Sequence, residues 1–135
     1  MIVIDASAMV AWLLNEPGKL SIPELNDLLA QHEVVVPAHW PSEIGNALVT
    51  NQRRGRVSGG DFEWIISELA RFQISPEPPL SINEFATTVS FALEHELAYY
   101  DAAYVKLAVD TEAALATLDD DMRRVALQFG VAIIP

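Results

Sequence analysis

Four acidic residues, far apart in the sequence, stand where an apolar run ends or where a helical pattern begins. They are Asp5, Glu43, Asp101 and Asp119. Two of them directly follow short apolar runs that are typical of buried strands, and the other two open predicted helices. On a parallel sheet, the carboxyl ends of the strands and the first turns of the following helices lie at one edge. We therefore expect the four carboxylates to lie close together.

Four neighbouring carboxylates repel one another strongly unless a cation is bound between them. The chain contains no Cys, so a metal site has to use oxygen or imidazole ligands, and carboxylates favour Mg²⁺ or Mn²⁺. Two such ions about 4 Å apart activate water, hold the attacking and leaving oxygens in line and neutralise a phosphodiester transition state. The acids therefore predict a metal-dependent nuclease in which activated water, and not a side chain, is the nucleophile.

Strand-like and helix-like segments alternate along the chain. Short apolar runs predict strands at 2–4, 34–36, 114–118 and 131–134, with a possible short strand at 73–74. Apolar residues at helical spacing predict helices at 6–14, 21–31, 43–54, 61–72, 82–95, 101–110 and 120–129. The pattern breaks at 15–18 and at 76–79, where Pro and Gly or several Pro occur.

This alternation predicts an α/β fold, a three-layer α/β/α sandwich around a short parallel sheet of four to five strands. A chain of 135 residues is long enough for one hydrophobic core, so we expect residues 1–135 to form a single domain. The first apolar run ends after four residues, and no stretch approaches the ~18 apolar residues of a membrane span. We therefore expect a cytoplasmic protein that does not bind membranes.

The net charge is the observation that agrees least with a nucleic-acid substrate. Eight Lys and Arg against 19 Asp and Glu give a net charge of −11. Nucleic-acid-binding proteins are usually basic, because phosphate contacts supply much of their affinity. Bound divalent cations would offset part of this charge, and other acids could lie away from the substrate. The charge therefore makes RNA a less expected substrate without excluding it.

Four segments resemble the ordered sequence motifs of PIN domains, a family of nucleases. The run from Ile2 to Ser7 resembles the family's opening, an apolar strand that ends in Asp before a small residue and Ser or Thr. Residues 41–48 resemble the second motif, a Glu with Asn three residues later, and residues 97–104 and 115–119 resemble the third and fourth. The order and the chain length also match. The third motif, Tyr-Asp-Ala-Ala-Tyr followed by Val-Lys-Leu-Ala, is especially similar to bacterial VapC toxins.

The resemblance implies hydrolysis of RNA with Mg²⁺ or Mn²⁺. It implies that the ions are bound, directly or through water, by Asp5, Glu43, Asp101 and Asp119. It also implies a homodimer and a VapB-type antitoxin that inhibits the toxin. Because the site is acidic, we expect the antitoxin to present Arg or Lys toward Asp5 and Asp119.

Several polar residues near the acids are candidates for supporting the metal ligands through hydrogen bonds. They are Ser7, Asn46, Thr117 and Asp121. Asn46 lies one turn after Glu43 on the same helical face. Within the run from Asp119 to Asp121, Asp119 fits the family spacing best, and Asp121 could share its role.

Each of the four acids also has a structural alternative. Asp5 and Asp119 could cap the helices that follow them, and Glu43 and Asp101 could complement helix dipoles. The His residues lie outside the four motifs, and we assign none of them a catalytic role. They are His32, His39 and His95.

Two other functions remain open. A PIN-fold protein without catalysis would be a binding module, which a metal titration would distinguish from a nuclease. A haloacid-dehalogenase-type phosphatase would carry an Asp two residues after Asp5, and a receiver domain would carry a phosphoacceptor Asp near mid-chain. Position 7 is Ser and residues 43–60 contain no Asp, so the sequence weighs against a phosphoryl-transfer or receiver-like domain.

Overall fold

A computed structural model describes residues 1–14 and 22–134 of the chain. The strands are β1 (Ile2–Ile4), β2 (Val34–Val36), β3 (Ile74–Pro76), β4 (Ala114–Ala116) and β5 (Ile133–Ile134). The helices are α1 (Ala6–Leu13), α2 (Ile22–Gln31), α3 (Trp40–Arg53), α4 (Gly59–Arg71), α5 (Ile82–His95), α6 (Tyr99–Thr111) and α7 (Asp120–Gln128). Each strand except the last is thus followed by one or two helices, which agrees with the α/β pattern that the sequence predicts.

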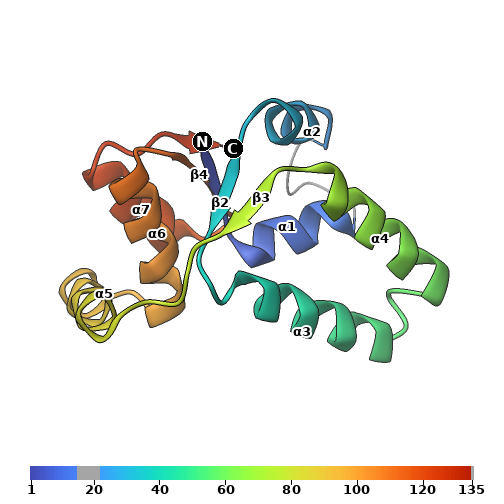
Figure 1. Ribbon diagram of the computed structural model, residues 1–135, viewed down its shortest axis with the longest axis horizontal. Helices are drawn as coiled ribbons and strands as arrows, with labels where there is room; N and C mark the ends of the chain where they lie inside the picture. The colour runs from blue at the N-terminus through green and yellow to red at the C-terminus, as the bar shows by residue number, and fades with distance from the viewer. Residues whose placement is uncertain (15–21, 135) are drawn as a thin grey trace.

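The strands of the described chain form one parallel sheet in the order β3-β2-β1-β4-β5 (Figure 1). The central strand is β1, in which Ile2 pairs with Val34 of β2 and with Ala114 of β4. Because all strands run in one direction, their carboxyl ends lie at one side of the sheet, which we call the carboxyl edge. Asp5 and Thr117 are the first residues beyond β1 and β4 at this edge.

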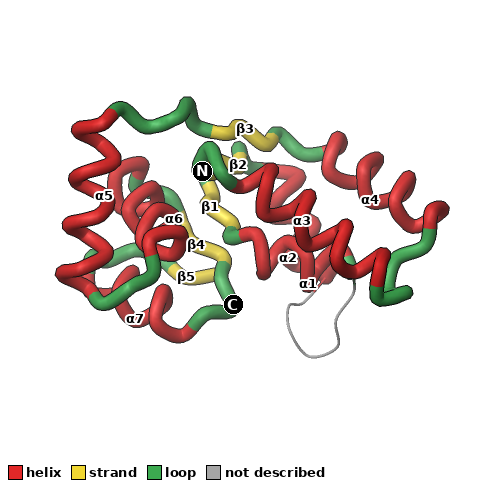
Figure 2. The backbone as a smooth tube through the Cα atoms, turned by 90° about the horizontal axis from the view of Figure 1, so that it is seen from below, coloured by secondary structure: helices red, strands yellow, loops and turns green. Residues whose placement is uncertain are grey.

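Helices cover both faces of the sheet. In Figure 1, α5, α6 and α7 lie on one side of the strands, and α1, α2, α3 and α4 lie on the other. Figure 2 shows the same division from below. Helix α6 contacts β1 and β4 directly, whereas α5 packs against α6. This arrangement confirms the predicted α/β/α sandwich with a short parallel sheet.

The middle of the sheet is fully buried. Val3 and Ile4 of β1 and Val34 and Val36 of β2 have no exposed surface. Each fully buried aliphatic side chain stabilises the fold by about 1.5–3 kcal/mol relative to an exposed one. The strand end that carries Asp5 is therefore held firmly by its neighbours.

The predicted strands at 2–4 and 34–36 match the structure, and the other strands differ at their ends. The strand predicted at 114–118 ends at Ala116, which pairs with Ile4, the last residue of β1. The strand predicted at 73–74 instead runs from Ile74 to Pro76. Pro76 is tolerated because β3 is an edge strand. The last strand is shorter than predicted and spans 133–134.

Three predicted helices, α3, α4 and α6, begin two or three residues earlier in the structure than the sequence predicts. Helix α3 begins at Trp40 and α6 begins at Tyr99, so Glu43 and Asp101 lie within first turns and do not open their helices. The break expected at 15–18 and the expected start of a helix at Ser21 lie outside the described residues.

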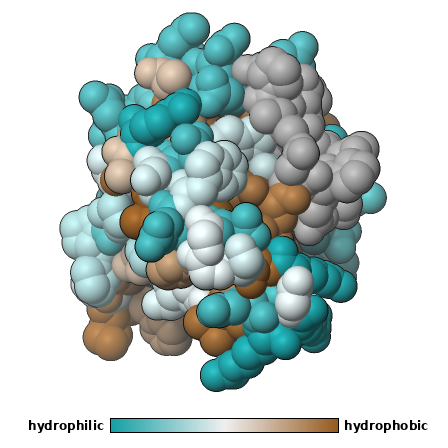
Figure 3. All heavy atoms as spheres, turned by 90° about the vertical axis from the view of Figure 1, so that its right-hand side faces the viewer, coloured by the Kyte–Doolittle hydropathy of each residue, from teal (hydrophilic) through white to brown (hydrophobic). Residues whose placement is uncertain are grey.

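The surface mixes polar and apolar side chains. Figure 3 shows the side of the molecule on which α3 and α4 lie, where hydrophilic residues surround smaller apolar areas. On α4, the exposed large apolar residues are Phe62, Trp64 and Ile66. In residues 1–14 and 22–134, no helix has the length and apolar character required to cross a membrane.

Candidate active site

Asp5 is the first residue beyond β1 and caps the N-terminus of α1. Its Oδ1 accepts hydrogen bonds from the backbone N–H of Ala8 at 2.6 Å and from the hydroxyl of Ser7 at 2.9 Å. Its Oδ2 accepts a hydrogen bond from the hydroxyl of Thr117. Only 3% of Asp5 is exposed. One carboxylate thus caps a helix and lies at the carboxyl edge, and three donors fix its orientation.

Thr117 connects Asp5 with Asp119. Its side chain is fully buried, and its hydroxyl donates to Asp5 and accepts from the backbone N–H of Asp119 at 3.1 Å. Asp119 in turn caps α7, because its Oδ1 accepts from the N–H of Met122 at 2.8 Å. The pairing of β1 with β4 therefore brings together two motifs from opposite ends of the chain.

Glu43 is partly buried in the first turn of α3. Its Oε1 accepts a hydrogen bond of 2.9 Å from the hydroxyl of Tyr104. Nε2 of His39 lies 2.9 Å from the same oxygen, although these two atoms make no hydrogen bond. Burial raises the pKa of Glu43, the Tyr104 hydrogen bond opposes this shift, and the charge of Asp5 adds to it. Burial lowers the pKa of His39, which favours its neutral form.

Asp101 lies in the first turn of α6 and interacts electrostatically with the other acids. Its side chain accepts no hydrogen bond from the described residues. Burial raises the pKa of Asp101 most, and the next causes are the charges of Asp119, Asp5, Glu43 and Asp121, in that order. The structure therefore brings the four predicted acids close enough to act on one another.

The three consecutive acids at the start of α7 differ in their contacts. Asp119 is the helix cap and has the largest electrostatic influence on Asp101. Asp121 also acts on Asp101, while one of its oxygens lies 3.5 Å from Arg124. Asp120 is exposed and is not among the charges that shift the pKa of Asp101. The charge of Asp121 therefore acts on Asp101, whereas that of Asp120 does not.

The side chains of the four acids do not surround one point at which a metal ion could bind. In the part of the chain that the structure describes, no three His, Asp or Glu side chains converge closely enough to hold a metal ion. Ser7 and Thr117 lie beside Asp5, where the sequence places them. Asn46 is exposed and makes no hydrogen bond with the described residues, so the structure does not bring it to the carboxylate of Glu43.

A depression of about 440 Å³ opens beside the acids. Glu43 and Asp119 line it together with Ser7, and the apolar side chains of Val10 and Ala47 form other parts of its wall. Two of the four predicted acids therefore face a hollow large enough to admit a substrate phosphate.

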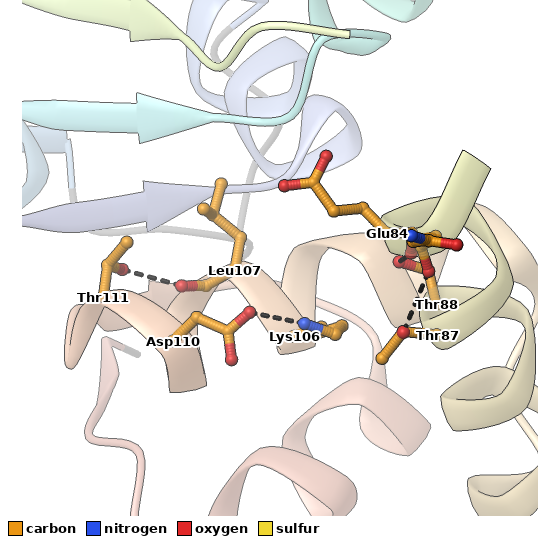
Figure 4. Close-up of polar contacts among 8 residues, drawn as sticks. Glu84, Thr87, Thr88, Lys106, Leu107, Asp110 and Thr111 are labelled. Atoms are coloured by element: carbon orange, nitrogen blue, oxygen red, sulfur yellow. Dashed lines mark hydrogen bonds and ion pairs between the residues drawn. The ribbon is translucent and has the colours of Figure 1, made fainter. Parts of the chain in front are cut away.

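A larger depression of about 680 Å³ lies between α5, α6 and the segment 77–80. Figure 4 shows polar contacts on α5 and α6, several of them made by residues that line this depression. Lys106 Nζ pairs with Asp110 Oδ2 at 2.5 Å, and the hydroxyls of Thr88 and Thr111 donate to backbone carbonyls one turn earlier. Three acids line this depression, but Asp110 pairs with Lys106 and Glu84 caps α5 together with Ser81. We therefore place the candidate active site at the carboxyl edge.

Residues 2–127 match the sequence profile of the PIN domain. The chain belongs to the PIN-domain family. Ribonuclease VapC9 of Mycobacterium tuberculosis is 31% identical to it over 119 residues, which cover 88% of this chain and 86% of that protein. These two findings confirm the resemblance that the four motifs indicated.

Two solved structures have a similar PIN-domain fold. FitAcB from Neisseria gonorrhoeae matches with a TM-score of 0.67 and 19% identity, over 100% of this chain and 97% of that chain. VapBC2 from Rickettsia felis, bound to a DNA fragment from their promoter, matches with a TM-score of 0.64 and 15% identity, over 99% and 98%. At these identities the matches support the fold.

Two residues of this PIN-domain site were not predicted, Tyr104 and His39. Tyr104 lies one turn after Asp101, and a buried Tyr hydroxyl requires a partner, but nothing in the sequence indicated Glu43 as that partner. His39 lies four residues before Glu43, a spacing that joins neighbours on a helix. This signal was missed because the sequence analysis began the helix at Glu43, whereas α3 begins at Trp40 with His39 as its N-cap.

Proposed function

We propose that this PIN-domain protein is the endoribonuclease toxin of a VapBC-type toxin–antitoxin pair, and that it requires Mg²⁺ or Mn²⁺. The proposed ligands of the ions are Asp5, Glu43, Asp101 and Asp119. The observation that carries the proposal is the geometry of the carboxyl edge, where Thr117 links Asp5 to Asp119 and where Glu43 and Asp119 line one depression. The raised pKa of Asp101, caused by burial and then by the charges of the other three acids and of Asp121, agrees with this geometry. The ribonuclease activity named for the relative VapC9 supports the same reaction.

The chemistry of the donor set fits a hard divalent cation. Such ions prefer carboxylate oxygens, and a cation relieves the repulsion that contributes to the raised pKa of Asp101 and Glu43. Asp5 and Asp119 are fixed by hydrogen bonds to one or both oxygens. The carboxylate of Asp101 and Oε2 of Glu43 accept no hydrogen bond from the described residues, so these oxygens are available to a cation.

A bound divalent cation supplies a Lewis acid for the phosphodiester and lowers the pKa of water. The side chains of the protein position that chemistry. Thr117 and Ser7 orient Asp5 through their hydroxyls, and Asp119 and Glu43 line the depression that receives the scissile phosphate. Because the chain carries a net charge of −11, the acids alone repel RNA, and the cation is also needed for substrate binding.

The proposal is tested by incubating the purified protein with structured and single-stranded RNA in Mg²⁺, in Mn²⁺ and in EDTA. We expect cleavage with either metal and none in EDTA. Without a cation the acids repel one another and no Lewis acid is present to activate water or the phosphodiester. Sequencing of the cleavage ends identifies the cut. Cleavage that continues in EDTA after exhaustive dialysis would refute the metal requirement. A protein that binds Mn²⁺ and RNA without cleavage would instead be a PIN-fold binding module.

We propose a VapB-type antitoxin as the partner, with Arg or Lys directed at the acids. The burial of the acids changes which of them we expect the Arg or Lys side chains to contact, compared with the pair Asp5 and Asp119 predicted from the sequence. Asp5 is almost fully buried and already accepts three hydrogen bonds, whereas Glu43, Asp101 and Asp119 are only partly buried. We therefore expect charge-assisted pairing with the latter three. Unchanged affinity of the antitoxin for a Glu43→Gln, Asp101→Asn variant would contradict this placement.

We also propose a homodimer that packs through α5. This helix exposes Ile82 and Leu93, with 81% and 77% of their surfaces accessible, and Phe85 is exposed between them. Their spacing places them on one side of the helix. A second copy would bury this apolar stripe. We expect a dimeric mass in sedimentation at micromolar concentration and a monomeric mass for Leu93→Glu, while a monomeric wild type would refute the dimer.

Two further proposals concern the domain organisation of the chain and its location in the cell. We propose that residues 1–135 act as a single PIN domain and that the toxin works in the cytoplasm, where its RNA substrate is located. Expression of the chain with and without the neighbouring antitoxin gene tests both points, because growth should stop only when the antitoxin is absent. A receiver-like or phosphoryl-transfer function finds no support in the family match.

A further inference from the structure

The hydroxyl of Tyr104 contacts one of the four acids directly. Only 2% of this residue is exposed, yet its Oη donates a hydrogen bond of 2.9 Å to Oε1 of Glu43, a residue 61 positions earlier in the chain. Tyr104 follows Asp101 by one turn of α6. A buried phenol that donates to a carboxylate from a different helix constrains that carboxylate, because the phenol has no alternative partner in water.

We propose that Tyr104 is a positioning residue that holds Glu43 by one oxygen, directs the other oxygen toward the carboxyl edge, and thereby sets the affinity of the site for its divalent cation. This inference rests on the proposed function, since it assumes that Glu43 is a metal ligand.

The two oxygens of Glu43 have different surroundings. Oε1 accepts the Tyr104 hydrogen bond and has Nε2 of His39 at 2.9 Å, so no space remains there for a cation. Oε2 accepts no hydrogen bond from the described residues, and the side chain lines the depression that Asp119 also lines. The contact with Tyr104 therefore decides which oxygen of Glu43 is free.

The phenol is suited to this role because its neutral hydroxyl donates one hydrogen bond to a carboxylate. The hydroxyl of Tyr104 thus joins two parts of the site, the first turn of α3, where Glu43 lies, and α6, which also carries Asp101.

Loss of the hydroxyl should weaken metal binding without removing a ligand. Residues that orient metal ligands typically change metal affinity by about 10–100-fold when substituted. In Tyr104→Phe the ring still fills its place in the core, but Glu43 is free to turn both oxygens to solvent. We therefore expect the dissociation constant for Mn²⁺ to rise about tenfold or more, and kcat for RNA cleavage to approach the wild-type value once Mn²⁺ is saturating.

Tyr100→Phe is the matched control. Tyr100 lies on the same helix, its ring also contacts the His39 ring, and its side chain is exposed. Removing its hydroxyl leaves the bond between Tyr104 and Glu43 intact, so we expect the Mn²⁺ affinity of Tyr100→Phe to equal that of the wild type. Circular dichroism of each variant confirms that the fold is retained.

The experiment measures Mn²⁺ binding directly, by the electron paramagnetic resonance signal of free Mn²⁺, in wild type, Tyr104→Phe, Glu43→Gln and the double variant. If Tyr104 acts through Glu43, its substitution has no further effect on binding in the Glu43→Gln background. Equal Mn²⁺ affinity of wild type and Tyr104→Phe would overturn the inference, as would an equal loss in both backgrounds. Absence of Mn²⁺ binding by the wild type would instead overturn the metal-dependent function, and the inference with it.

Discussion

The acidic site has two halves that are built differently. Asp5 and Asp119 follow strands that pair with each other, and their carboxylates accept hydrogen bonds from the N-terminal N–H groups of the next helices. Glu43 and Asp101 lie within the first turns of α3 and α6, and burial raises the pKa of both. The first half is organised by local hydrogen bonds and the second by the packing of helices.

The two halves differ in how the burial of negative charge is compensated by hydrogen-bond donors. Donors compensate the burial of Asp5, because each of its oxygens accepts at least one hydrogen bond. Asp101 has no such donor among the described residues. A cation should therefore stabilise the half with Glu43 and Asp101 more than the half with Asp5 and Asp119, and the following predictions test this contrast.

The largest expected effect is the loss of ribonuclease activity in Asp5→Asn and Asp101→Asn. Each substitution removes a negative charge from a site that is proposed to bind Mg²⁺, and metal-assisted transition-state stabilisation is worth several kcal/mol. We expect kcat/KM to fall about 100-fold or more in both variants, measured on a defined RNA at saturating Mg²⁺. Ser67→Ala, on the exposed surface of α4, is the control. Wild-type turnover in either Asn variant would remove that acid from the site.

Thr117→Val should have the next largest effect, on stability. The substitution removes the donor to Oδ2 of Asp5, which is buried, and the acceptor of the Asp119 N–H, which is partly buried. An unsatisfied buried group costs about 1–3 kcal/mol, so we expect a loss of unfolding free energy in this range from urea titration. Thr117→Ser keeps the hydroxyl and should lose about 1 kcal/mol or less, the value of one methyl group. Equal losses in both variants would show that the hydroxyl does not support the first half.

Asp101→Asn should stabilise the metal-free protein. The pKa of Asp101 is raised in the folded state, so the folded protein keeps a proton that the unfolded chain loses, and stability falls as pH rises from the ordinary value of 3.8 through the folded pKa. In EDTA at neutral pH, Asp101→Asn should gain about 0.5–1 kcal/mol, at the low end because the side chain is partly exposed and screened.

In Mg²⁺ the wild type should become more stable than Asp101→Asn, which reverses the order of stability expected in EDTA. Below pH 3.8 the advantage of Asp101→Asn should vanish, since the wild-type carboxyl is then protonated in both states. In millimolar Mg²⁺ the wild type should gain more stability, because it retains the full ligand set. Thermal unfolding across pH in EDTA and in Mg²⁺ measures both effects. Identical curves for the two proteins under all conditions would place Asp101 outside the charge cluster.

The smallest expected effect is on RNA cleavage by Asp121→Asn, and it should distinguish Asp121 from Asp120, the other exposed acid after Asp119. The charge of Asp121 acts on Asp101, but it is the weakest of the causes that raise the pKa of that carboxyl, and Asp120 is not among them. We expect Asp121→Asn to change kcat/KM by about threefold or less, a difference of under 1 kcal/mol. Asp120→Asn should have no effect on cleavage. A loss of more than about 100-fold in Asp121→Asn would make Asp121 a ligand in its own right.

The sequence by itself determined the fold class and the positions of the four acids. Apolar runs such as Ile2 to Ile4 predict buried strands from local pattern alone, and an Asp after such a run caps the next helix through a hydrogen bond three residues away. Because parallel strands end at the same edge, the order of these local features was enough to predict that Asp5 and Asp119 lie close to Glu43 and Asp101.

The tertiary structure alone decided which side chains contact one another across that edge. The bonds from Tyr104 to Glu43 and from Thr117 to Asp5 join residues 61 and 112 positions apart, and no local pattern encodes them. They depend on the rotation of α3 and α6 about their own axes and on the register of β1 against β4. For the same reason, Asn46 shares a turn with Glu43 yet lies in solvent, because helical spacing sets which residues are neighbours, whereas packing between layers sets which of them face the site.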